Sequence, residues 1–171
     1  MFSDPIKNLK TLTLKESDIV ADLGAGTGYY AVAAGKMVPS GKVYAVEVHK
    51  EYLETIKHKA KEANLSNVEC FWGNVEKIGG TKIKDSIVDV VIASNILFQV
   101  EDKILFIEEL KRILKHTGKV LLVDWSDSSS LGLLTAIPKT QAREMFEKKG
   151  FVWQRDIDAG AHHYGMILVK T

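Results

Sequence analysis

The stretch Val20-Ala21-Asp22-Leu23-Gly24-Ala25-Gly26-Thr27-Gly28-Tyr29 decides how the rest of this chain is arranged. An apolar run leads into a loop with glycine at every second position, and small residues typical of a helix follow over 30–38. A buried strand, a glycine-rich turn and a helix N-terminus form the opening unit of a ligand-binding α/β domain. The glycines let a ligand approach the backbone where a Cβ would block it.

Two details of this loop indicate the kind of ligand. A dinucleotide-binding loop has its third small residue one position later, where this chain has Tyr29. Asp22 stands two residues before the first glycine, and a carboxylate there repels a pyrophosphate but suits an ammonium group. A nicotinamide-dependent oxidoreductase on a similar sheet is therefore the less favoured interpretation.

The spacing D-x-G-x-G-x-G from Asp22 to Gly28 resembles motif I of the class I S-adenosylmethionine (SAM)-dependent methyltransferases. The resemblance extends over residues 15–171 and implies that the loop holds the methionine end of SAM. The SAM carboxylate can then use free N–H groups of the following helix. The loop residues expected to bind SAM are Asp22, Leu23, Gly24, Ala25, Gly26 and Gly28.

An acid follows the next predicted strand, 42–48. Glu47 lies about 20 residues beyond the glycine loop, where dinucleotide and SAM folds alike place an acid for ribose hydroxyls. We expect Glu47 and its neighbour Val48 to contact the ribose. The alternative is a solvated acid at a strand end.

Two later segments resemble further cofactor positions of the family. Asn74 and Val75 follow the predicted strand 67–71, where the resemblance implies contacts with adenine. The family usually has Asp at position 74, but an Asn side-chain oxygen also accepts a hydrogen bond. Ser94 and Asn95 follow the apolar strand 87–93, which resembles motif IV, and are candidates for the SAM amino group and the reacting centre.

Strand and helix patterns alternate along the chain. Helical spacing predicts helices over 52–63, 101–118 and 142–149, and a polar loop replaces a helix at 79–86. A strand at 120–123 and a closing pair at 151–157 and 164–169 complete the pattern. It predicts an α/β fold: a doubly wound, mostly parallel seven-stranded sheet with an antiparallel C-terminal hairpin strand, in one domain over 1–171.

Composition narrows the class of protein. The formal net charge of +1 argues against a nucleic-acid partner, and no apolar run reaches the ~18 residues of a membrane span. The single cysteine, Cys70, indicates a reducing compartment, so we expect a cytoplasmic location. No cluster of His, Cys, Asp or Glu has metal-ligand spacing. A homodimer is compatible with the sequence.

The predicted activity is transfer of the SAM methyl group to a small molecule, with the acceptor atom (O, N, C or S) left open. We assign no catalytic residue, since displacement from a sulfonium needs mainly alignment and desolvation. A non-catalytic SAM-binding or regulatory subunit is the alternative. Asp124 is expected to be a solvated strand-end acid, with a general base or substrate anchor as the alternative, and at most one of His162 and His163 can face a site. Residues 125–139 are expected to form a lid over the substrate; the alternative is a permanent helix packed on the sheet or on a second subunit.

Overall fold

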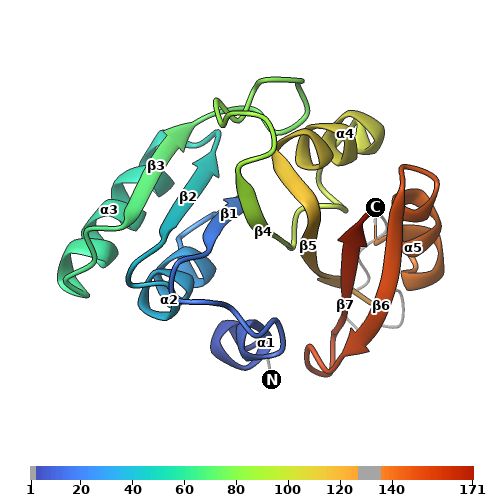
Figure 1. Ribbon diagram of the computed structural model, residues 1–171, viewed down its shortest axis with the longest axis horizontal. Coiled ribbons are helices and arrows are strands. Elements are labelled where there is room, and N and C mark those ends of the chain that lie inside the picture. Colours follow the sequence, from blue (N-terminus) through green and yellow to red (C-terminus); the bar gives the residue numbers. More distant parts are fainter. Residues whose placement is uncertain (1–2, 127–135) are drawn as a thin grey trace.

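The computed structural model describes residues 3–126 and 136–171. The strands form one sheet in the order β3-β2-β1-β4-β5-β7-β6, as Figure 1 shows. The strands are β1 (Ile19–Leu23), β2 (Lys42–Glu47), β3 (Val68–Trp72), β4 (Val88–Ser94), β5 (Leu114–Trp125), β6 (Phe151–Ile157) and β7 (His163–Lys170). The helices are α1 (Pro5–Lys10), α2 (Tyr29–Met37), α3 (Lys50–Glu62), α4 (Lys103–Ile113) and α5 (Lys139–Glu147).

The first five strands run parallel, and β7 is antiparallel to both β5 and β6. This confirms the predicted fold class. Alternate strand residues face opposite sides of the sheet. Val90 and Ile92 pack with α1, α2 and α3, whereas Val91 and Ala93 pack with α4 and α5. Both faces of the central strands are therefore buried, which explains their continuous apolar runs.

The helix α1 is an element that the sequence patterns did not predict. The side chain of Asp4 accepts hydrogen bonds from the N–H groups of Ile6 and Lys7, and Pro5 occupies the first turn. Leu9 and Leu12 are buried against the sheet. Six residues form a helix only marginally alone, so its packing on the sheet stabilises it.

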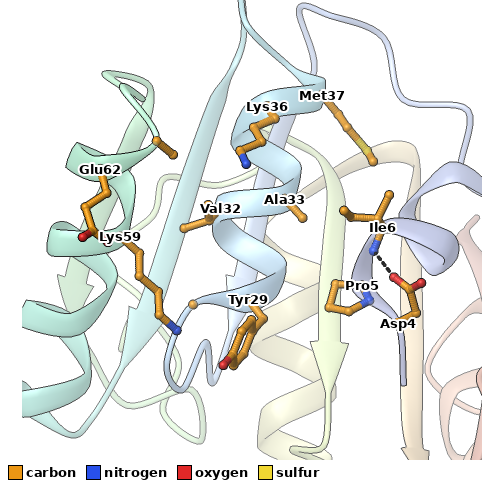
Figure 2. A pocket seen from close by; sticks show the side chains of 12 residues that line it. Asp4, Pro5, Ile6, Tyr29, Val32, Ala33, Lys36, Met37, Lys59 and Glu62 are labelled. Carbon is orange, nitrogen blue, oxygen red and sulfur yellow. Dashed lines mark hydrogen bonds between the residues drawn. The ribbon is translucent and has the colours of Figure 1, made fainter. Parts of the chain in front are cut away.

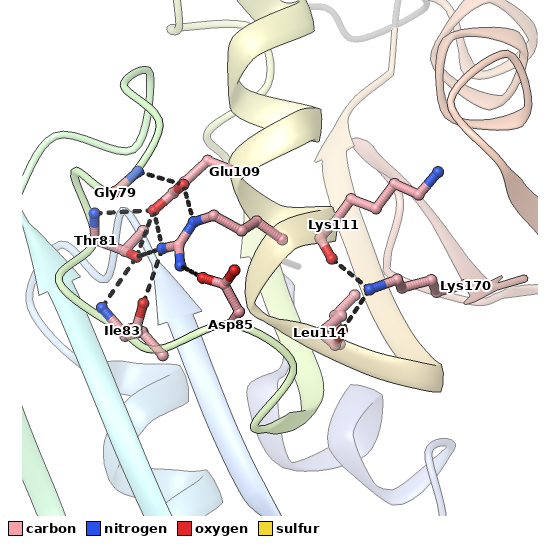
Figure 3. A network of polar contacts seen from close by, with 9 residues as sticks. Gly79, Thr81, Ile83, Asp85, Glu109, Lys111, Leu114 and Lys170 are labelled. Carbon is pink, nitrogen blue, oxygen red and sulfur yellow. Dashed lines mark hydrogen bonds and ion pairs between the residues drawn. The ribbon is translucent and has the colours of Figure 1, made fainter.

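The helix expected over 101–118 ends at Ile113, where β5 begins at once. The ammonium group of Lys170 donates to the carbonyl oxygens of Lys111 (2.7 Å) and Leu114 (2.6 Å), so a distant strand satisfies the helix end (Figure 3). Gly118 lies within a register shift of the β4–β5 pair instead of ending the helix. A Cβ there would meet the Leu114 side chain at 2.7 Å.

No helix links β3 to β4, as predicted, and a buried carboxylate holds that connection in place. Glu109 of α4 accepts from the N–H groups of Gly79 (2.8 Å) and Thr81 (3.1 Å), and from Arg112 Nε at 2.8 Å (Figure 3). Burial by itself raises the pKa of Glu109, but these hydrogen bonds lower it to about 2. The connection is thus tied to α4 by charge-assisted hydrogen bonds.

The expected lid over 125–139 falls largely outside the described residues, because 127–135 are not among them. Its residues Leu131, Leu133 and Leu134 lie there, while Ile137 packs against the core on the α4 side. The lid therefore stays a prediction. In the two ranges that the structure describes, no helix is long and apolar enough to cross a membrane.

Candidate functional site

The carboxyl ends of β1 and β4 meet where the chain changes direction across the sheet. The connection after β1 passes through α2 on one face, and the connection after β4 passes through α4 on the other. Open α/β sheets bind ligands at such switch points. Two cavities lie here, with volumes of about 610 Å³ and about 500 Å³.

We call them the β4 cavity and the β2 cavity, after the strands that end beside them. The β4 cavity is lined by Asp22, Ala25, Tyr30, Ser94, Asn95, Trp125 and His163, among others. The β2 cavity is lined by Glu47, Val48, Tyr52, Asn74 and Val75, among others. Gly24, Gly26 and Gln99 line both, so the two cavities adjoin and can hold different ends of one ligand.

Asp22 lies at the inner wall of the β4 cavity and is only 2% exposed. The backbone of Ala31 donates to its carboxyl group, but Oδ2 is buried without a hydrogen-bond partner. Burial, with a smaller contribution from the nearby charge of Glu47, raises the pKa of Asp22 to about 7, against the lowering effect of the Ala31 hydrogen bond. An unpaired buried oxygen of this kind costs free energy unless a ligand donates to it.

Gly26 lines both cavities and has a positive φ of 52°. A Cβ at Gly26 would meet no protein atom within 4 Å, so it would project into the space that a ligand uses. At Gly28 (φ 82°) a Cβ would instead meet Ile56 at 2.7 Å. The glycines of the loop therefore have different roles: Gly26 leaves room at the site, and Gly28 allows α2 to pack on α3.

Glu47 lies at the end of β2 and is 6% exposed, so the alternative of a solvated acid is wrong. Its Oε2 accepts from the N–H of Gly26 at 2.9 Å. Its Oε1 accepts from Val48 (2.8 Å) and His49 (3.0 Å). The carboxylate thus links the glycine loop to the turn after β2, while it also lines the β2 cavity.

Asn74 and Val75 lie across the β2 cavity from the glycine loop. The side-chain oxygen of Asn74 accepts from the N–H of Glu76 at 2.8 Å, which fixes the turn after β3. A carbonyl oxygen has two lone pairs, so one remains for a ligand donor. The side chain of Val75 is buried in the core, so only its backbone can contact a ligand.

Asn95 follows β4 with a positive φ of 53°, a conformation in which Asn is several-fold enriched among non-glycine residues. Its Oδ1 lies 2.9 Å from Nε2 of His163, which is 8% exposed. The His163 ring packs against Trp125, with ring centroids 4.2 Å apart. Burial lowers the pKa of His163, which favours the neutral ring, and Nε2 is the donor because the amide oxygen of Asn95 can only accept. Of the two adjacent histidines, His163 is the one that faces the site.

Asp124 is fully buried, so the expectation of a solvated acid is wrong. Its carboxyl group accepts from the N–H groups of Trp125 (2.7 Å) and Phe98 (3.3 Å). Burial raises the pKa of Asp124 to about 6, against these backbone hydrogen bonds. Asp124 therefore fixes the turn that carries Asn95 and does not line either cavity.

A comparison with protein families matches residues 14–167 to the methyltransferase domain family. The chain belongs to this family. The resemblance to class I SAM-dependent methyltransferases seen in the glycine loop is thereby confirmed. A SAM-dependent methyltransferase from Aquifex aeolicus has a similar structure, with a TM-score of 0.89 and 28% sequence identity. The match covers 99% of this chain and 91% of that one.

Two curated relatives show how far this methyltransferase domain is shared. A demethylmenaquinone methyltransferase from Geobacillus sp. is 29% identical over 125 residues, which is 72% of this chain and 52% of the relative. A probable ribosomal RNA small subunit methyltransferase A from Pyrococcus furiosus is 32% identical over 111 residues. That match covers 65% of this chain and 35% of the relative. The chain thus spans about half, or less, of the length of these relatives.

The structure brings ten of the twelve predicted contact residues to the two cavities. The other two are Leu23, which is buried in the core, and Gly28, which packs α2 on α3. The sequence patterns missed Tyr30 and Gln99 as lining residues. Trp125, the last residue of β5, begins the segment that was expected to cover the substrate, and it lines the β4 cavity. Among the described residues, no group of His, Cys, Asp or Glu is arranged to hold a metal ion.

Proposed function

We propose that this methyltransferase domain binds SAM and transfers its methyl group to a small molecule. The unpaired, buried Oδ2 of Asp22, just before the glycine loop, is the observation that carries the proposal. It fits the ammonium group of SAM, which is a charged donor. The open space where a Cβ of Gly26 would project fits a ligand that lies against the backbone.

The adjoining cavities divide the cofactor contacts between two groups of residues. Asp22, Ala25 and Ser94 would hold the methionine end in the β4 cavity. Glu47 and Asn74 would hold ribose and adenine in the β2 cavity. A carboxylate accepts from two adjacent ribose hydroxyls, and Glu47 exchanges backbone contacts for these as the ligand enters.

When bound, SAM would supply an activated methyl group for transfer to a lone pair of the acceptor, with S-adenosylhomocysteine as the other product. The chain contributes alignment and exclusion of water. The Trp125 and His163 rings form an aromatic wall of the β4 cavity. Because Oδ1 of Asn95 accepts the hydrogen bond from His163, the side-chain N–H groups of Asn95 remain to donate to the methyl acceptor. Such positioning supplies a large part of the barrier reduction in displacement reactions.

A small-molecule acceptor is supported by the net charge of +1, which offers no electrostatic footprint for nucleic acid. The Geobacillus relative is named for demethylmenaquinone, a small molecule, whereas the Pyrococcus relative is named for ribosomal RNA. We infer in addition one domain over 1–171, since all seven described strands share one sheet. We propose a cytoplasmic location, which the single free Cys70 supports.

Calorimetry with SAM, S-adenosylhomocysteine and NAD tests the proposal. Both SAM compounds should bind and NAD should not, because Asp22 repels a pyrophosphate. Glu47→Ala should weaken S-adenosylhomocysteine binding by ~1.5–3 kcal/mol, the range for hydrogen bonds to a charged group. Glu69→Ala is the matched control, because Glu69 is a surface acid of β3 that forms an ion pair with Lys42 of the neighbouring strand β2. Binding of NAD, with no binding of SAM or S-adenosylhomocysteine, would overturn the proposal.

A transfer assay with labelled SAM separates an enzyme from a SAM-binding or regulatory subunit. Methyl transfer to any member of a panel of small metabolites supports the enzyme. Tight binding of S-adenosylhomocysteine with no transfer to the panel favours the regulatory alternative. Ribosomal RNA in the same assay tests the competing class of acceptor.

A further inference from the structure

A third hollow runs along the outer side of α2, between α1 and α3, and we call it the α2 groove (Figure 2). Its volume is about 700 Å³, within the usual range of small-molecule pockets. Its walls are mainly apolar and include Pro5, Ile6, Tyr29, Val32, Ala33 and Met37. None of these residues was singled out as a ligand contact from the sequence.

The α2 groove leaves apolar side chains in contact with water. Ile6 is 50% exposed and Tyr29 is 68% exposed, on the two sides of the groove. Clustered exposed apolar residues next to a cavity mark binding sites more often than isolated ones do. Helical spacing places Tyr29, Val32, Ala33 and Met37 in one stripe that runs ~12 Å along α2.

The groove adjoins the β4 cavity. Pro5 and Tyr29 line both hollows, and Figure 2 shows both residues near the N-terminal end of α2. An elongated ligand that passes Pro5 and Tyr29 would therefore reach from Asn95 and His163 onto the face of α2. These shared residues distinguish the α2 groove from an unrelated surface depression.

Four charged residues line the groove, two lysines (Lys36 and Lys59) and two acids (Asp4 and Glu62), so their formal charges sum to zero. Lys59 donates to the carbonyl oxygen of Thr27 at 2.8 Å, and its Nζ lies 3.9 Å from the centroid of the Tyr29 ring. A hydrogen bond and a cation–π contact thus hold Lys59 at the glycine loop. The balanced charge and the apolar stripe of α2 favour an uncharged chain over an anionic ligand.

We propose that the α2 groove holds the apolar chain of an amphipathic methyl acceptor whose polar head lies in the β4 cavity. This inference rests on the proposed function, since it takes the β4 cavity as the place of methyl transfer. It names the acceptor class: a polar, methylatable head joined to an extended hydrocarbon chain. Each methylene that enters the groove leaves water, so affinity increases with chain length.

The test is an NMR titration of the ¹⁵N-labelled protein, saturated with S-adenosylhomocysteine, with 1-hexanol, 1-octanol and 1-decanol. The amide signals of Ile6, Tyr29, Val32 and Ala33 should shift, and the Kd should fall at least about twofold per added methylene. The indole N–H signal of Trp125 should shift with 1-decanol, because the hydroxyl end of this longest alcohol reaches the β4 cavity.

Ile6→Glu and Ile104→Glu form a matched pair of variants. Both residues occupy the second position of a helix and are about half exposed, at 50% and 53%. Ile6→Glu should weaken 1-octanol binding about fivefold or more, because it places a charge beside the chain. Ile104→Glu, which lies on α4 away from the groove, should leave the Kd unchanged.

Three outcomes would overturn the inference. The first is an affinity that does not depend on chain length, and the second is groove shifts without a Trp125 shift, which would separate the groove from the β4 cavity. The third is a dimer in sedimentation that Ile6→Glu dissociates, which would make the groove a subunit interface. Binding of S-adenosylhomocysteine is titrated first without alcohol, so failure of the proposed function is detected independently.

Discussion

Asn95 and His163 are 68 residues apart in the sequence, and their side chains lie 2.9 Å apart at the edge of the β4 cavity. The bond joins the end of β4 to the first residue of β7 across β5. Because Nε2 of His163 donates to Oδ1 of Asn95, it determines which end of the amide faces the cavity. The pair thus links the antiparallel hairpin to the candidate site.

Replacement of His163 tests this link. His163→Leu leaves a half-buried amide oxygen without its donor, so the free energy of unfolding should fall by about 1–3 kcal/mol. His163→Gln can still donate and should lose less. Urea denaturation of the three proteins measures the difference. Equal losses in the two variants would show that packing on Trp125, and not the hydrogen bond, accounts for the effect.

The raised pKa of Asp22 predicts a pH dependence of ligand binding. The carboxyl group is half ionised near pH 7, and only its charged form attracts an ammonium group. The affinity for S-adenosylhomocysteine should therefore decrease as the pH falls below about 7, by at most about tenfold per unit. Calorimetry between pH 5.5 and 8.5, in steps of roughly half a unit, measures it. Asp22→Asn should bind weakly and without this dependence.

Asp22 has the opposite effect on the fold. Its pKa is higher in the folded protein than the ordinary 3.8, so the folded state binds more protons between pH 4 and 7. The stability that the protonated group contributes is lost as the pH rises through this window. At pH 8, Asp22→Asn should therefore unfold at a higher urea concentration than the parent protein. A lower midpoint would mean that the carboxylate is stabilised by contacts other than that with Ala31.

Substitution of Gly26 should abolish ligand binding, whereas substitution of Gly28 should lower stability. Gly26→Val should abolish binding of S-adenosylhomocysteine, because its side chain enters the ligand space. The protein should remain folded, at a cost of about 1–2 kcal/mol for a positive φ. Gly28→Ala should chiefly lower stability, because its Cβ meets Ile56. Thermal unfolding and calorimetry on both variants separate these effects; full affinity in a folded Gly26→Val protein would place the ligand elsewhere.

Glu109 should be among the residues on which stability depends most. Glu109→Leu leaves Nε of Arg112 and two backbone N–H groups without their acceptor, so we expect a loss of about 3 kcal/mol. The pKa of about 2 is below the ordinary 4.5, so this contribution is complete above pH 4.5 and lost as the pH falls towards 2. Urea denaturation at pH 7 and pH 3 should show a smaller difference between variant and parent at pH 3.

Glu147→Leu is the control for that measurement. Glu147 also pairs with an arginine of its own helix, Arg143, but the pair is exposed. Exposed pairs contribute little, so the variant should change stability by less than about 0.5 kcal/mol. A comparable loss in both variants would contradict the role given to the buried network.

Local patterns were enough to predict most elements and the position of the site. The glycine loop after an apolar strand identifies a βα unit, and the order of later elements leaves few possible sheets. The same patterns failed at the end of α4. There Gly118 is a typical helix stop, but Lys170 from β7 satisfies the last helix carbonyls five residues earlier. A contact between distant segments overrode the local signal.

The sequence by itself determined the family, the sheet and the residues that end its strands, because each depends on short spacings such as that from Asp22 to Gly28. Only the tertiary structure decided what surrounds those residues. Burial made Glu47 a bridge to the glycine loop, left Oδ2 of Asp22 without a partner and brought His163 to Asn95. It also placed α1 beside α2 to form the groove. These features depend on which distant segments pack together, and no local spacing encodes that packing.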